Sequence, residues 1–79
     1  MDRTEITAKL TGIFRKVFHD DSLVIADAMT ANDVERWDSL SHMILITEIE
    51  KAFSVRFRLK ELNKMRNIGE MKDLISSKL

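Results

Sequence analysis

Residues 37–53 read WDSLSHMILITEIEKAF, and this stretch decides the fold. Apolar residues recur in it at intervals that predict an amphipathic helix; they are Leu40, Met43, Ile46, Ile49 and Phe53. Asp38 is expected to cap this helix by accepting a hydrogen bond from a backbone N–H of the first turn. Ser39 then lies near the positive end of the helix dipole, where a phosphate attached to its hydroxyl would be stabilised.

Two further helices are predicted, one at each end of the chain. The first carries a continuous apolar stripe: Ile6, Leu10, Ile13, Phe14, Val17 and Phe18. Asp2 and Glu5 precede this stripe at the spacing of a capping box, and Asn67 and Glu70 repeat that spacing before the last helix. The last helix has its own apolar face: Met71, Leu74 and Ile75.

Residues 19–37 show no sustained period and are rich in Asp, Asn, Ser and Thr, so they are predicted to form a connection longer than most. Five apolar residues are expected to hold this connection against the core: Leu23, Val24, Ile25, Met29 and Val34.

After Phe53 the apolar residues Val55, Phe57 and Leu59 alternate with basic ones, which indicates an extended segment. A single strand has nothing to pair with, so we expect a loop that leads into a short third helix around residues 59–65. The predicted fold is all-α, a four-helix bundle with a long first connection and a short third helix.

Composition indicates one compact domain comprising residues 1–79. This length is near the lower limit for a single core without cross-links, and the chain contains no repeat and no proline. Because it contains no cysteine, it can form neither a disulfide nor a Cys-based zinc site, and no metal site is predicted.

Over its whole length the sequence resembles the acyl carrier proteins and the carrier domains of polyketide and nonribosomal peptide synthases. The resemblance rests on the amphipathic first helix, the long connection ending in Trp37-Asp38-Ser39-Leu40, the helix after it, and the last helix opened by Asn67-Ile68-Gly69. In that family the serine of the Asp-Ser-Leu motif carries 4′-phosphopantetheine. The resemblance therefore implies that Ser39 is the covalent attachment point, with Asp38 and Leu40 on either side of it.

A carrier of this kind is not an enzyme. Its pantetheine thiol holds acyl groups as thioesters, and the implied partners are a phosphopantetheinyl transferase and acyl-activating, condensing or acyl-transfer enzymes. Asp38, Ser39 and His42 do not predict a hydrolase triad, because Asp38 and His42 project from different parts of the first turn and no oxyanion site is evident.

The second helix is expected to meet the partner enzymes through His42, Ile44, Thr47 and Glu48. Ile44 stands where many carriers of fatty acid synthesis have an acidic residue. Residues 43–46 are all apolar and cannot all face the core, so at least one of them must be exposed or contact a neighbouring loop. If Ile44 is exposed, it favours docking through apolar contact.

The charge of this chain differs from that of the fatty acid carriers, which are usually strongly acidic. Its 13 basic and 13 acidic residues balance, but from Lys51 onward the basic residues dominate, so the third-helix region is basic. Complementary charge governs which partners meet, so the balance favours a specialised fatty-acid, polyketide or modified-lipid pathway. Neutral overall charge and the lack of a recognition motif argue against nucleic-acid binding.

The charged start of the chain lacks the apolar stretch of a signal peptide, and no apolar run is long enough to cross a bilayer. We therefore expect a cytoplasmic protein without membrane insertion, and a monomer. Two alternatives stay open: an aminoacyl or peptidyl carrier protein, and an unmodified helical module that binds a protein partner.

Overall fold

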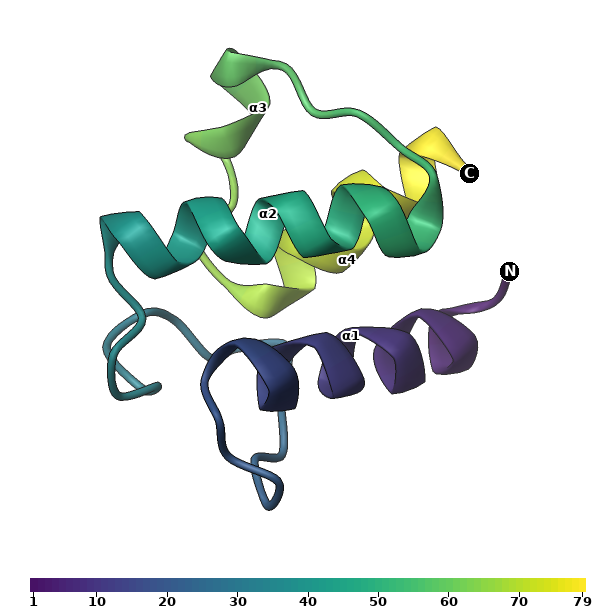
Figure 1. Ribbon diagram of the computed structural model, residues 1–79. Helices are drawn as coiled ribbons and strands as arrows, with labels where there is room; N and C mark the ends of the chain where they lie inside the picture. The colour runs from purple at the N-terminus through teal and green to yellow at the C-terminus, as the bar shows by residue number, and fades with distance from the viewer.

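The computed structural model describes residues 1–79 and contains four helices and no strand. They are α1 (Arg3–Val17), α2 (Ser39–Phe53), α3 (Leu59–Leu62) and α4 (Ile68–Lys78). α1 packs against both α2 and α4. Figure 1 shows α1 and α2 running in opposite directions, α4 behind α2, and α3 on the side of α2 away from α1. The predicted all-α fold with four helices, a long first connection and a short third helix is confirmed.

The helix starts follow the predicted caps, with one difference. Asp2 accepts a hydrogen bond from the backbone N–H of Glu5 (2.9 Å), and Asn67 accepts one from that of Glu70 (2.8 Å). The return bonds from the Glu5 and Glu70 side chains do not form, so each capping box is half complete.

One cluster of 16 buried apolar residues forms the core. In α1 the predicted stripe is correct: Ile6, Leu10, Phe14 and the following Phe18 are buried, while Ile13 and Val17 pack at the edge of the cluster. α4 contributes Ile68, Met71 and Ile75. The prediction of α1 succeeded because its apolar residues recur at steps of three and four that stay on one side of the helix.

The apolar face predicted for α2 was partly wrong. Leu40 is 74% exposed and Met43 is 51% exposed, whereas the buried residues of α2 are Leu45, Ile46, Ile49 and Phe53. Three residues fall short of a full turn by about 60°. Three such steps therefore place Leu40 on the side opposite Ile49, so the run beginning at Leu40 drifts around the helix and cannot follow the core.

Hydrogen bonds hold the first connection to two helices. The Arg15 Nε of α1 donates to the Leu23 carbonyl (2.8 Å), while the backbone N–H groups of Ile68 and Gly69 donate to the carbonyls of Met29 and Asp27 (3.0 and 2.9 Å). These bonds tie the connection to the end of α1 and to the start of α4.

Four of the five apolar residues expected to pin the connection do so. Ile25 and Val34 are buried, and Leu23 and Met29 pack against the core. Val24 is 73% exposed, which corrects that prediction. Neighbouring residues of an extended segment point to opposite sides, so Val24 faces outward between Leu23 and Ile25.

The segment after α2 is a loop followed by one helical turn. α2 ends at Phe53 and is capped by Ser54, which has a left-handed backbone (φ 55°). The backbone N–H of Phe57 donates to the Glu50 carboxylate (2.9 Å), which holds the loop against α2. α3 then ends at Leu62, three residues before the predicted end, although Met65 beyond it is buried. None of the four helices combines the length and the apolar composition that a membrane span requires.

Candidate functional site

Ser39 is the first residue of α2, and Asp38 caps that helix as predicted. The Asp38 Oδ1 accepts a hydrogen bond from the Ser41 backbone N–H (2.9 Å), and the Ser41 hydroxyl accepts one from the Asp38 N–H (2.8 Å), which completes a capping box. The Ser41 N–H lowers the pKa of the Asp38 carboxyl, with a smaller contribution from the Ser41 hydroxyl. The Ser39 side chain is exposed and takes no part in these bonds, so its hydroxyl is available for reaction.

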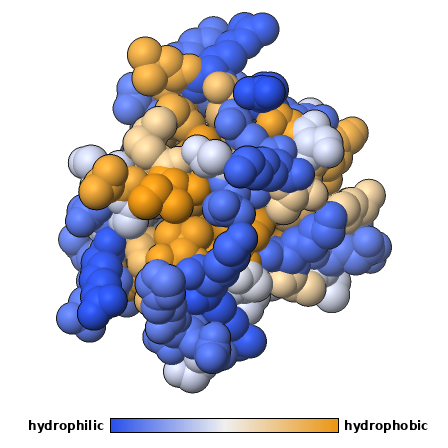
Figure 2. Space-filling view, viewed as in Figure 1, coloured by the Kyte–Doolittle hydropathy of each residue, from blue (hydrophilic) through white to orange (hydrophobic).

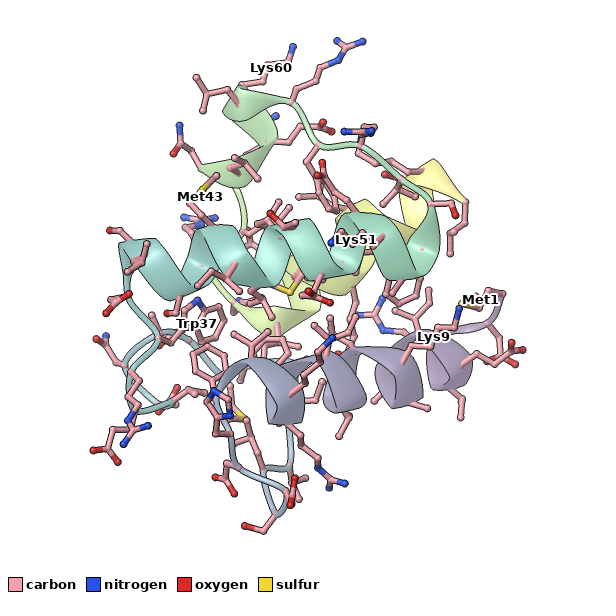
Figure 3. All side chains as sticks on the ribbon, in the orientation of Figure 1. Met1, Lys9, Trp37, Met43, Lys51 and Lys60 are labelled. Carbon is pink, nitrogen blue, oxygen red and sulfur yellow. The ribbon has the colours of Figure 1, made fainter.

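The residue before the cap is anchored in the core. Trp37 is 8% exposed and meets Phe14 of α1 edge-on, with ring centroids 5.3 Å apart. Figure 3 shows Trp37 between α1 and the first half of α2. The side chain of Trp37 therefore fixes the position of the chain immediately before Ser39.

Trp37 also orients His42. Its indole N–H donates to the His42 Nδ1 (3.1 Å), and the two ring planes are inclined by 22° with their centroids 6.0 Å apart. Nδ1 can accept this bond only when it carries no proton, so the neutral imidazole holds its proton on Nε2. Partial burial lowers the pKa of His42, which favours the same neutral form.

A cleft of about 380 Å³ opens beside Ser39. It is formed by the end of the first connection, the start of α2 and the segment around the end of α3; its lining residues are Ala31, Trp37, Asp38, Ser39, His42, Leu62, Met65 and Arg66. One wall is therefore apolar and aromatic, while Arg66 provides a cation at its border. Arg66 is itself paired with Glu70 (3.4 Å).

Asp38, Ser39 and His42 share this cleft but do not form a relay. The Asp38 carboxylate is engaged by the Ser41 N–H, and the His42 Nδ1 is engaged by Trp37. The His42 backbone N–H donates to the Asp38 carbonyl (2.9 Å) as part of the helix, but no hydrogen bond joins the His42 side chain to the side chain of Ser39 or Asp38. No cluster of three or more His, Cys, Asp or Glu side chains is placed to hold a metal ion.

The residues predicted to contact partners lie in three different settings. Ile44 is 50% exposed, and Thr47 is exposed one turn further along α2. His42 lines the cleft. Glu48 points toward α1 instead, where it pairs with Lys16 (3.3 Å). Leu40, predicted beside the attachment point, is exposed next to Ser39.

Several residues of the site were not found from the sequence. The spacing of Asp38 and Ser41 matches that of Asp2 and Glu5, so the role of Ser41 in the cap could have been predicted by the same rule. Leu62, Met65 and Arg66 line the cleft because the chain folds back past the start of α2, and no local pattern carries that information.

Comparison with known proteins identifies the family. A search of solved structures found the solution NMR structure of a holo acyl carrier protein from Geobacter metallireducens, which is 47% identical to this chain. The match covers 91% of this chain and 83% of that one, with a TM-score of 0.86. A scan against protein-family models and a search of the curated proteins found no match. At this identity and coverage, with the same four-helix fold, the chain belongs to the acyl carrier protein family.

Proposed function

We propose that this protein carries acyl groups on 4′-phosphopantetheine attached to the Ser39 oxygen. The observation that supports this most directly is the exposed, unengaged hydroxyl of Ser39 at the capped start of α2, in a chain 47% identical to an acyl carrier protein described as holo. When bound, the prosthetic group supplies a thiol that holds an acyl group as a thioester.

The residues around Ser39 fit such a group. A phosphodiester on the Ser39 oxygen would lie at the positive end of the α2 dipole. Arg66 lines the same cleft and is exposed, and although it pairs with Glu70 its guanidinium has further N–H groups that can donate to a phosphate. The apolar side chains of Leu62 and Met65 offer the first part of the arm a surface that needs no hydrogen bonds.

The residues around Ser39 contribute by holding it in a fixed position. Asp38 and Ser41 fix the first turn, and Trp37 anchors the preceding residue to α1. Ser39 therefore points into solvent from a rigid base, where a phosphopantetheinyl transferase can reach its oxygen. Acyl carrier proteins are not enzymes, so the condensing, activating or transfer chemistry belongs to the partners.

The pathway we propose is a specialised one, such as the synthesis of a modified lipid, a polyketide or an unusual fatty acid. The support is the charge of the chain, in which 13 basic residues balance 13 acidic ones. Incubation of the modified protein with acyl-activating and amino-acid-activating enzymes separates an acyl carrier from an aminoacyl or peptidyl carrier. We propose a cytoplasmic location, where coenzyme A and such enzymes are found.

The test is intact-mass spectrometry after incubation with coenzyme A and a promiscuous phosphopantetheinyl transferase. The parent is expected to gain one phosphopantetheine and Ser39→Ala none. Ser76→Ala is the matched control, since Ser76 is exposed on α4 away from the cap, and this variant should gain the group as the parent does. A folded parent that stays unmodified with several transferases would contradict the proposal.

A further inference from the structure

The outward side of α2 carries a row of apolar residues that the core does not use. Leu40, Met43 and Ile44 are each at least half exposed, and Thr47 and Lys51 continue the same side at helical spacing. Leu59 at the start of α3 is 79% exposed. Figure 2 shows apolar surface interrupted by polar surface on the side of the molecule where α2 lies in front.

Unpaired basic side chains border this row. Lys51 of α2, Arg56 and Arg58 of the loop, Lys60 of α3 and Lys64 after it are all exposed, and none of them belongs to an ion pair. In Figure 3, Lys51 lies on α2 and Lys60 on α3. We call these five basic residues, together with Leu40, Met43, Ile44 and Leu59, the α2–α3 face.

The carboxylates of the same two helices are occupied within the protein. Glu48 pairs with Lys16 of α1, Glu50 accepts the Phe57 N–H, and Glu61 pairs with Lys78 (2.9 Å) and accepts the Arg58 N–H (2.8 Å). Two other basic residues in the second half of the chain already have partners. Lys72 is 5% exposed and binds Asp27, and Lys78 binds Glu61. Glu48 and Glu61 are thus paired with cations and only Glu50 is not, so five unpaired basic side chains leave the face with net positive charge although the whole chain is neutral.

The face also has a hollow suited to a carboxylate. A depression of about 390 Å³ at the end of α2 is lined by Lys51 and Arg56, together with Thr47, Glu50, Ser54 and Val55. The Glu50 carboxylate accepts the Phe57 N–H and keeps its negative charge, but the two cations outnumber it, so the lining carries net positive charge. An Asp or Glu side chain of another protein could enter between the two cations and gain a charge-assisted hydrogen bond.

We propose that the α2–α3 face binds partner enzymes whose carrier-docking surface combines an apolar contact with flanking Asp and Glu side chains. The inference rests on the proposed function, because the face begins at Leu40, beside the Ser39 that a partner must reach. The occupant is a protein because the exposed row is apolar and adjoins the attachment site. Enzymes with a basic docking surface are excluded by like-charge repulsion with the five cations.

The test uses the protein modified on Ser39 and loaded with one acyl group, after intact mass has established the modification. Two purified condensing enzymes serve as probes, one whose entrance is lined by Asp and Glu and one whose entrance is lined by Lys and Arg. At about 25 mM KCl the kcat/KM with the acidic enzyme should exceed that with the basic enzyme by about tenfold or more, and the ratio should shrink by about 300 mM.

Charge reversal identifies the side chains responsible. Arg56→Glu combined with Lys60→Glu should lower kcat/KM with the acidic enzyme about tenfold and raise it with the basic enzyme. The matched control adds the same four units of negative charge at exposed neutral positions away from the face, through Thr4→Glu, Ala8→Glu, Ala28→Glu and Ser76→Glu, and should leave the preference intact. Changing an entrance Asp of the acidic enzyme to Lys should restore transfer from the reversed carrier. Circular dichroism verifies that each variant is folded.

Three results would overturn the proposal. One is a parent that prefers the basic enzyme, and another is an equal effect of the test and control variants. The third is tight binding of the parent to anionic phosphatidylglycerol vesicles or to duplex DNA at about 150 mM salt, which would assign the face to lipid or nucleic acid. Since modification of Ser39 is measured first, these results count against the face and leave the carrier function standing.

Discussion

Ser39 lies at a position that its neighbours hold rigid. The Asp38 carboxylate and the Ser41 hydroxyl satisfy each other's backbone N–H groups, and the Ser41 hydroxyl also donates to the Arg36 carbonyl (2.7 Å). Arg36 has a left-handed backbone (φ 73°), which turns the chain immediately before the cap. The Asp-Ser-Leu motif therefore works together with residues on both sides of it.

Loss of the Ser41 hydroxyl should weaken this start of α2. Ser41→Ala removes the acceptor for the Asp38 N–H and the donor to the Arg36 carbonyl. We expect the free energy of unfolding to fall by about 1 kcal/mol, measured by urea denaturation. Ser76→Ala on α4 has no such bonds to lose and should be neutral or slightly stabilising, since Ala favours helix; equal stability of the two variants would contradict the role of Ser41.

His42 should make stability depend on pH in a defined window. Burial lowers its pKa in the folded protein, so the unfolded chain binds its proton more readily. The stabilisation is therefore complete above the unfolded value of 6.5 and is lost as pH falls below it. The folded protein also lowers the carboxyl pKa values of Asp27, Asp38 and Glu61. The stabilisation that these carboxylates give is lost in acid too, but only as pH falls below their ordinary pKa values of 3.8 and 4.5.

Urea unfolding at about pH 7.5 and about pH 5.5 isolates the histidine. The parent should be less stable at the lower pH, and fluorescence of its single tryptophan, Trp37, should report the change beside the site. In His42→Gln the loss between these two pH values should be smaller. If both proteins lose the same stability, His42 is not the titrating group.

At the scale of the elements, local spacing predicted the ends of the chain better than its middle. α1 follows a stripe that remains on one side, and both terminal helices begin at the predicted Asp2 and Asn67 caps. The position of α2 in the chain was predicted correctly, but its buried side was not, because residues on its outward side are also apolar. α3 ends at Leu62, and no repeat of spacing describes that end or the bond from Phe57 to Glu50 that holds the loop before it.

The two glycines give a matched test of how the first connection meets α4. A Cβ added at Gly69 would lie 3.1 Å from the Asp27 Cβ and 3.3 Å from the Asp27 carbonyl oxygen, whereas at Gly12 nothing lies within 4 Å. Gly12→Ala should therefore stabilise the fold by about 1 kcal/mol through helix propensity. Gly69→Ala should give no gain or a loss, because Asp27 must move. Thermal melts of both variants decide this, and equal stabilisation would contradict the close contact.

At the scale of the whole molecule, contacts between residues far apart in sequence join the first connection to α1 and α4. Arg3 bonds to Asp73 and Asp27, and the nearly buried Lys72 bonds to Asp27 (2.6 Å), so one aspartate of the connection joins α1 and α4. These contacts span 24 to 70 residues, and the cleft likewise combines Trp37 and Ser39 with Leu62 and Met65, so local spacing could predict the helices but not the cleft.

A change in core packing at Phe14 should alter the position of Trp37 beside the site. Phe14 is fully buried, and its ring meets the indole edge-on. Phe14→Leu is expected to cost about 1–2 kcal/mol of stability and to shift Trp37 emission to longer wavelength. Phe57→Leu, at a partly buried position, is the control and should change neither by as much. Unchanged emission in Phe14→Leu would contradict the anchoring of Trp37.

The measurement that tests the central claim most directly is top-down tandem mass spectrometry of the modified protein. The chain has six serines, Ser22, Ser39, Ser41, Ser54, Ser76 and Ser77. Fragment ions should confine the added phosphopantetheine between Asp38 and Leu40 and leave the other five serines unmodified. Placement of the group on any other serine would contradict the account of the site, even if the total mass were that of one phosphopantetheine.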